Sequence, residues 1–287
     1  MNNVTITPLG NEHCDTGENP YWTSSDGCVY WTDIPRGKLF RYDTQTGTHE
    51  TIYQGEPVGG FTLQKDGSWL LFRVNDIVRM TPEGVVTSLL PFADETAQRF
   101  NDVIADAQGR VFAGTIGADR ESGGLYRVDL DGTITKLFAG TGCANGMGFT
   151  SDLSQFYWTC STNRQIFRFR YDPETGALTD RELFYQSAPD EATPDGMVVD
   201  SSGIVWSAQY GSSAILKLDP TDGRIVDRIT LPVSRITSLT FGGSELDTMY
   251  VTTAGGKTDV DSADGTLYSV TGSGATGQPE FLSNIRP

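Results

Sequence analysis

The sequence is poor in the residues and patterns on which several protein classes depend. It holds 2 His and 4 Cys in 287 residues, and Cys14, Cys28, Cys143 and Cys160 show no CxxC spacing. This disfavours a zinc site built from histidine or cysteine. No run approaches the roughly 20 apolar residues that a membrane helix needs. No GxSxG motif is present, and no GxGxxG or GxxxxGK[ST] pattern opens a helix, so the corresponding hydrolase and nucleotide-binding folds are not indicated.

Basic side chains are also scarce. The chain has 21 Lys and Arg against 37 Asp and Glu, a formal net charge of −16. Because such a chain repels nucleic acids and anionic membranes, we expect neither as a partner. The N-terminal residues lack the basic and apolar regions of a secretory signal. We therefore expect a cytoplasmic protein with free thiols, although a Cys143–Cys160 pairing stays open. The sequence does not indicate the oligomeric state.

Helical periodicity is almost absent, and short β-type runs recur instead. One kind is a turn followed by an aromatic-rich strand, at 26–33, 66–73, 108–115, 153–160, 202–209 and 246–253. The other is a strand that leads into a polar turn, at 38–47, 76–84, 124–132, 165–176, 214–223 and 266–274. The two kinds alternate throughout, with a repeat of about 40–50 residues, which is typical of propellers and solenoids.

This alternation predicts an all-β fold, a six-bladed β-propeller of four-stranded antiparallel blades around a central channel, which the residues discussed below predict to contain a metal ion. Each blade would begin with an innermost strand, and stacking six blades would bury the faces that one sheet exposes. We expect residues 1–287 to form one domain. The segments 3–7 and 279–284 are both strand-like, so we expect one of them to complete a blade that begins at the other end of the chain.

Four segments place polar residues directly before the aromatic-rich strands, in GENPYW (17–22), RFNDVIAD (99–106), ANGMGFT (144–150) and PDGMVVD (194–200). If these are equivalent blade positions, Glu18, Asn101, Asn145 and Asp195 converge at one end of the channel. Asn and Asp beside Gly also cap ordinary turns, but four matching positions favour a site. Two carboxylates and two carboxamides suit a hard divalent cation.

These segments resemble the regucalcin/gluconolactonase family (senescence marker protein/gluconolactonase/luciferin-regenerating enzyme-like), a family of six-bladed propellers. The resemblance rests on GENPYW, RFNDVIADAQGRVFAGT, CANGMGFTSDLSQFYWT, TPDGMVVDSSGIVWSAQYG and ITSLTFGGSELDTMYVTTA, and it spans roughly residues 14–256. The sequence departs from the family pattern where EGP has become ENP, at Asn19, and where an Asp has become Cys160 or Ser161.

The resemblance implies one divalent metal ion held by Glu18, Asn145 and Asp195, with Ca²⁺ first and Zn²⁺, Mg²⁺ or Mn²⁺ as alternatives. It implies that Arg99 and Asn101 bind substrate and that Asn101 also approaches the metal. An acidic substrate contact falls on Asp119, with Glu121 as its rival.

The predicted function is a metal-dependent lactonase that opens sugar (aldono-) lactones or similar small lactones. The cation would polarise the ring carbonyl and Asp195 would activate water. One alternative is hydrolysis of phosphotriesters or phosphofluoridates in the same channel, which an apolar mouth formed by Phe100, Phe149 and Tyr210 would favour. Another is a non-catalytic, calcium-binding propeller, because fold alone does not fix function.

Overall fold

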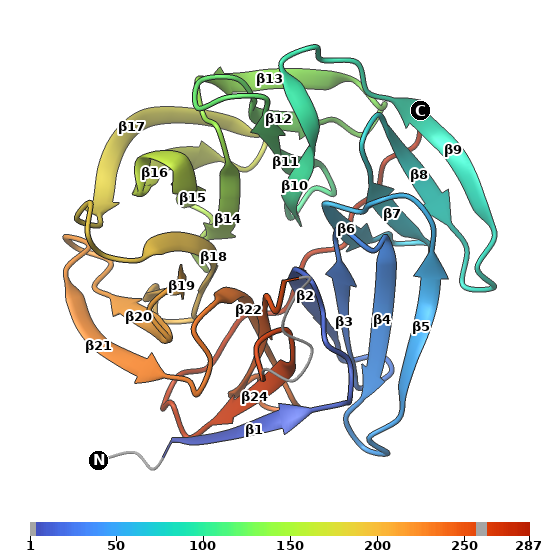
Figure 1. The fold of residues 1–287 in the computed structure, drawn as a ribbon. Coiled ribbons are helices and arrows are strands. Elements are labelled where there is room, and N and C mark those ends of the chain that lie inside the picture. Colours follow the sequence, from blue (N-terminus) through green and yellow to red (C-terminus); the bar gives the residue numbers. More distant parts are fainter. Residues whose placement is uncertain (1–3, 257–262) are drawn as a thin grey trace.

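The computed structural model describes residues 4–256 and 263–287, which form six four-stranded antiparallel sheets arranged as a β-propeller (Figure 1). The innermost strands are β2 (Gly17–Thr23), β6 (Gly60–Leu63), β10 (Ala97–Ala105), β14 (Ala144–Phe149), β18 (Thr193–Val199) and β22 (Ile236–Gly242). The second strands are β3 (Cys28–Asp33), β7 (Trp69–Phe72), β11 (Val111–Gly117), β15 (Gln155–Cys160), β19 (Val205–Tyr210) and β23 (Thr248–Thr253).

The third and outermost strands complete each sheet. The third strands are β4 (Lys38–Asp43), β8 (Asp76–Met80), β12 (Gly124–Val128), β16 (Gln165–Asp172), β20 (Ala214–Leu218) and β24 (Leu267–Thr271). The outermost are β5 (His49–Gln54), β9 (Val86–Pro91), β13 (Ile134–Ala139), β17 (Ala177–Gln186), β21 (Ile225–Thr230) and β1 (Thr5–Leu9). A 3₁₀ turn, Ser161–Asn163, follows β15. The predicted six-bladed propeller and the predicted strand order are confirmed.

The two ends of the chain close the ring in the sixth blade. Strand β1 pairs antiparallel with β24, from Thr5 opposite Thr271 to Leu9 opposite Leu267. The expectation that one terminal segment completes the last blade is therefore confirmed for the N-terminal segment. It is wrong that 279–284 is a strand, because this segment runs across the ring and makes one isolated bridge, Ser283 to Gln64.

Aromatic and aliphatic side chains fill the space between neighbouring blades. The second strands are buried on both faces because each lies between an innermost and a third strand and packs against the adjacent sheets. One such layer lies between the second and third blades. In it, the ring centroids of Phe72 and Phe92 lie 5.3 and 4.2 Å from the ring centroid of Phe100. The Phe72–Phe100 pair is edge-to-face, and such aromatic contacts stabilise the layer beyond the burial of apolar area.

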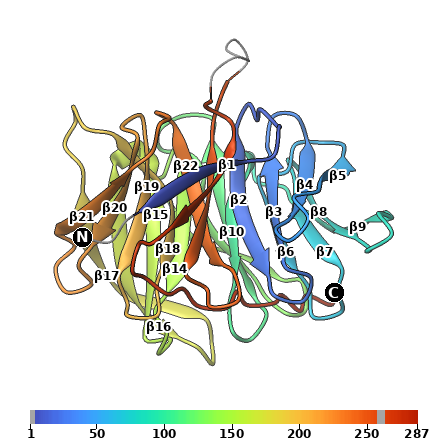
Figure 2. The ribbon, with the colours of Figure 1, turned by 90° about the horizontal axis from the view of Figure 1, so that it is seen from below.

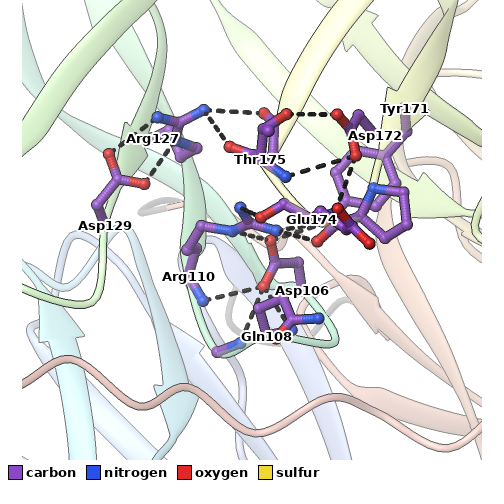
Figure 3. A network of polar contacts seen from close by, with 12 residues as sticks. Asp106, Gln108, Arg110, Arg127, Asp129, Tyr171, Asp172, Glu174 and Thr175 are labelled. Atoms are coloured by element: carbon purple, nitrogen blue, oxygen red, sulfur yellow. Dashed lines mark hydrogen bonds and ion pairs between the residues drawn. The ribbon is translucent and has the colours of Figure 1, made fainter.

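Polar contacts also tie neighbouring blades together, as Figure 3 shows for the third and fourth. Asp106 is fully buried, and its carboxylate accepts hydrogen bonds from the Arg110 Nε at 2.6 Å and the Tyr171 hydroxyl at 2.8 Å. The Arg110 guanidinium then donates to the carbonyls of Pro173 and Glu174 in the next blade. This buried ion pair joins two blades at the end of the ring opposite the starts of the innermost strands.

Candidate active site

Five of the innermost strands lose regular pairing in their first half. The interruptions lie between Glu18 and Tyr21, Asn101 and Val103, Ala144 and Met147, Pro194 and Met197, and Ile236 and Ser238. A β-bulge bends a strand and redirects its side chains, and bulges are frequent beside active sites. In β6 the pairing is continuous from Gly60 to Leu63, and the sequence predicts no site residue there.

The four residues expected to converge all lie at these bulges. Glu18 and Asn101 directly precede them, whereas Asn145 and Asp195 lie within them, and all four are buried. Glycine allows the blades to approach closely here. A β-carbon on Gly146 would meet the Met197 nitrogen at 2.4 Å. The structure therefore brings the four predicted residues to one end of the channel.

A chain of hydrogen bonds connects the site across three blades. Arg99 Nη1 donates to Asn101 Oδ1 at 2.8 Å, and Asn101 Nδ2 donates to Asn145 Oδ1 at 3.3 Å. Asn145 Nδ2 donates to the Ser161 hydroxyl at 3.1 Å, which donates to the Pro194 carbonyl at 2.7 Å. Because Pro194 precedes Asp195, this chain fixes Asn101, Asn145 and Asp195 relative to one another.

Further hydrogen bonds join the remaining blades near the starts of their innermost strands. Asn19 Oδ1 accepts the Phe61 N–H at 2.6 Å, which joins the first blade to the second. The Thr237 hydroxyl donates to the Gly17 carbonyl at 2.5 Å, which joins the sixth blade to the first beside Glu18. Asn19, where the sequence departs from the family pattern, thus holds a neighbouring strand. This inter-blade contact requires no metal.

The two predicted carboxylate ligands carry unfavourable electrostatics. Asp195 is 7 % exposed, and its Oδ1 is buried with no hydrogen-bond partner among residues 4–256 and 263–287. Burial and the nearby Asp102 raise the pKa of Asp195 well above its usual value. Burial, Asp195 and Asp102 do the same to the pKa of Glu18. Two buried carboxylates that repel each other, one with an unpartnered oxygen, fit a divalent cation between them.

The donor set indicates which cation fits. In the part of the chain that the structure describes, no group of three or more His, Cys, Asp or Glu side chains stands in a metal-binding arrangement. The predicted third ligand, the carboxamide of Asn145, is neutral, so Glu18 and Asp195 would supply the charge of such a set. An all-oxygen set of this kind suits Ca²⁺, Mg²⁺ or Mn²⁺ better than softer metals.

Arg99 and Asp102 complete the charges around the site. Burial lowers the pKa of the Arg99 guanidinium, while Cys143, Glu18 and Asp102 oppose that shift. Burial raises the pKa of Asp102 to about 7, although Arg99 opposes this. Asp102 has a left-handed backbone, with φ of 51°, which is uncommon for a residue with a side chain. The bulge after Asn101 imposes this conformation.

Sequence reasoning missed three residues of the site. Asp102 follows Asn101 in the RFND segment, so the motif itself was the available signal. Ser161 links Asn145 to Pro194, although the sequence marks it only as a departure from the family pattern. The Cys143 sulfur accepts a hydrogen bond from Asn145 Nδ2 at 3.7 Å, and Cys143 also lies near Asp195 and Arg99. All four cysteines are free, so the Cys143–Cys160 pairing is not formed.

Asp119 and Glu121 lie on the exposed loop after β11, at the same end of the third blade as Arg99. Asp119 Oδ1 accepts the N–H groups of Glu121 and Ser122 and the Ser122 hydroxyl, at 2.8–2.9 Å. These backbone hydrogen bonds lower the pKa of Asp119. Asp119 thus shapes its own loop at the rim of the site, and its contact with substrate stays a prediction.

The three aromatic residues expected near the mouth do not form an apolar lining there. Phe100 is buried between Phe72 and Phe92. Phe149 packs against Phe156 and Tyr171 lower in the ring, and Tyr210 is 38 % exposed. The expectation of a place near the mouth is wrong for Phe149, which ends β14, whereas Tyr210 lies opposite Thr193 at the start of β18, on the mouth side.

These features define a class of protein: a six-bladed propeller with a buried, oxygen-rich site at one end of its channel. Residues 16–255 match the family described as "SMP-30/Gluconolactonase/LRE-like region". The chain belongs to this family, which confirms the predicted resemblance and the predicted class of enzyme, a lactonase.

Individual relatives cover almost the whole chain. Pentonolactonase XacC of Haloferax volcanii is 40% identical over 291 residues, which cover 99% of each chain. Regucalcin of Oryctolagus cuniculus is 30% identical over 295 residues, covering 98% of this chain and 99% of regucalcin. The solved structure of a calcium-binding protein, regucalcin, from Agrobacterium tumefaciens has a TM-score of 0.85 at 24% identity, covering 96% of both chains. This last likeness shows the shared fold.

Within the described ranges, the structure contains no helix of the length and apolar character required to cross a membrane.

Proposed function

We propose that this protein is a divalent-metal-dependent lactonase that opens the ring of sugar lactones, with pentonolactones as the first candidates. The observation that carries the proposal is the convergence of Glu18, Asn145 and Asp195 at the channel end, where Asp195 Oδ1 has no partner among the described residues. The 40% identity to a pentonolactonase over the full chain supports the substrate class.

Glu18, Asn145 and Asp195 would hold one cation, with Ca²⁺ preferred because every donor is an oxygen. When bound, the cation supplies Lewis-acid polarisation of the lactone carbonyl. Neutralising two buried carboxylates also removes their mutual repulsion.

The side chains of this protein then supply positioning and proton transfer. Arg99 and Asn101, already joined by a 2.8 Å hydrogen bond, hold the substrate hydroxyls or carbonyl. Asp195 accepts a proton from the water that attacks the carbonyl carbon. The new C–O bond forms from the water oxygen, the ring C–O bond breaks, and the ring oxygen takes up the proton held by Asp195 and leaves as a hydroxyl. The product is an open-chain hydroxy acid.

The surroundings of the site favour lactones over phosphotriesters. Arg99 and Asn101 present hydrogen-bonding groups, while Phe100 packs between Phe72 and Phe92. Such groups recognise a polyhydroxylated substrate, whereas an apolar ester needs an apolar surface. We also propose a cytoplasmic location, for which the four free cysteines are the supporting observation.

The test is hydrolysis of a lactone panel by protein stripped with a chelator and then supplied with Ca²⁺, Mg²⁺, Mn²⁺ or Zn²⁺, followed by acid release. We expect turnover only with metal restored, and we expect Asp195→Asn to abolish it. Asp227→Asn, an exposed position on β21, is the matched control and should retain turnover. Metal binding without turnover on any lactone would overturn the lactonase proposal.

A further inference from the structure

The last residues of the chain run beneath the ring, at the end opposite the candidate active site (Figure 2). The Thr276 carbonyl accepts the Ser201 N–H at 2.8 Å in the fifth blade. Gln278 Nε2 donates to the carbonyls of Val199 and Asp200, at 3.0 and 3.2 Å, and lies 3.4 Å from that of Phe149. One side-chain amide therefore binds three backbone carbonyls of the fourth and fifth blades.

The same segment is fixed on the other side of the ring. The Ser283 N–H donates to the Leu63 carbonyl of the second blade, and the Ser283 carbonyl accepts the Lys65 N–H of the same blade, both at 2.9 Å. The Ile285 N–H donates to Gln64 Oε1 at 2.8 Å, and Gln64 Nε2 lies 3.3 Å from the Ile285 carbonyl. Ile285 also packs into the apolar layer between the second and third blades.

Between these anchors the segment crosses a cavity inside the ring. The cavity measures about 80 Å³ and is lined by all six innermost strands together with Gln278, Pro279, Glu280 and Phe281. At its upper end lie Asn19 and Asp102, which directly follow Glu18 and Asn101. At its lower end the Thr240 hydroxyl donates to Glu280 Oε1 at 2.9 Å. The cavity thus lies directly below the candidate active site and above the C-terminal segment.

We propose that residues 276–287, the floor strap, form a second closure of the ring that seals the far end of the channel. The pairing of β1 with β24 closes the ring within one blade. The floor strap instead spans the ring from the fourth and fifth blades to the second and third. It converts an open channel into a chamber with one mouth, so that substrate, product and solvent enter and leave on the site side only. This inference does not depend on which reaction the site catalyses.

The test compares two thiols in the full-length chain. Tyr210 is exposed and lies opposite Thr193, at the site end of the fifth blade, so Tyr210→Cys reports access from the mouth side. Val198 lines the cavity and is partly buried, so Val198→Cys reports access to the chamber. Labelling with a charged thiol reagent, resolved by peptide mass spectrometry, gives both rates in one sample of the double variant. We expect the thiol at position 198 to react more slowly than the thiol at position 210, by about tenfold or more.

A second variant releases the floor strap without shortening the chain. Gln64→Ala with Gln278→Ala removes the side-chain contacts at both anchors, and Gln45→Ala with Gln54→Ala, at exposed positions, is the matched control. Release should speed labelling at position 198 by about tenfold while the thiol at position 210 keeps its rate. Equal labelling at 198 in released and control proteins would overturn the proposal. So would labelling at 198 as fast as at 210 in the chain with an intact strap, a comparison that holds even if the released variant fails to fold.

Discussion

Two buried aspartates of this propeller have opposite surroundings. Asp106 accepts five hydrogen bonds, three from backbone N–H groups of its own turn and two from Arg110 and Tyr171. Asp195 keeps an oxygen with no partner in the described part of the chain, close to Glu18 and Asp102. Both side chains are almost inaccessible, so burial alone does not distinguish them.

The difference separates a structural role from a functional one. A buried carboxylate with full hydrogen bonding and a paired cation joins elements without requiring a ligand. A buried carboxylate that lacks hydrogen-bond partners or a paired cation destabilises the fold until a ligand binds it. The propeller therefore carries its satisfied charges between blades and its unsatisfied charges at the channel end, where a cation and a substrate are expected.

The largest effect should come from Asp195→Asn. The amide keeps the shape of the side chain but removes a charge and a base, so lactone turnover should fall by about 10³-fold. The melting temperature of the metal-free protein should stay the same or rise, because a repulsive buried charge is lost. Steady-state kinetics and thermal unfolding measure the two effects. A large fall in melting temperature would place Asp195 with Asp106 as a structural residue.

Asp106→Asn should reverse that pattern. It leaves the Arg110 guanidinium buried without its charge partner, which costs about 3–5 kcal/mol. The melting temperature should fall by about 10 °C, while turnover per folded molecule at lower temperature stays near that of the parent. Differential scanning calorimetry with matched activity assays tests this. Unchanged stability would contradict the role given to the network of Figure 3.

Metal binding should depend on pH in a defined direction. The raised pKa values of Glu18 and Asp195 mean that ionising them destabilises the metal-free fold. That penalty is absent below the ordinary carboxyl range and grows as pH rises. Stabilisation by Ca²⁺ should therefore increase from about pH 5 to about pH 8, and binding should release protons. Thermal shift across pH, with calorimetry in two buffers, checks this, and a pH-independent shift would count against it.

The smallest effects should come from the rim loop. Asp119→Asn keeps an acceptor for the N–H groups of Glu121 and Ser122 but removes the charge. If Asp119 contacts substrate, this variant should raise KM by about tenfold with little change in kcat. Glu121→Gln is the paired variant and should change KM less. A normal KM for Asp119→Asn beside a raised KM for Glu121→Gln would transfer the substrate contact to Glu121.

The sequence predicts the propeller well because each blade repeats the same local pattern. Alternating apolar and aromatic residues bounded by turn residues are sufficient to place β3 and β4 and their five counterparts. The four site residues could be found because they occupy matching positions before those strands. Their arrangement in space could not be predicted, since it depends on bulges that remove one or two residues from the pairing of five of the six innermost strands.

Other errors have similar physical origins. Residues 279–284 read as a strand in the sequence. In the structure, the backbone of Ser283 bonds to the second blade and that of Asn284 to Gly109 in the third, so the segment makes one isolated bridge and no strand. Phe100 sits beside Arg99 and Asn101 in sequence, yet successive side chains in a strand point to opposite sides. Phe100 therefore enters the aromatic layer with Phe72 and Phe92. Its position next to two site residues in the sequence did not predict where its side chain lies.

The pairing of Thr5 with Thr271 has a consequence for synthesis. During synthesis β1 emerges before the five blades that follow it, whereas its partner strand β24 emerges after all five of them. Strand β1 therefore keeps unpaired backbone groups while five blades form, and the sixth sheet is completed only after β24 has emerged. Such long-range pairing is slow and exposes a free strand edge in the meantime. The joining of β1 to β24 is thus expected to come late in folding.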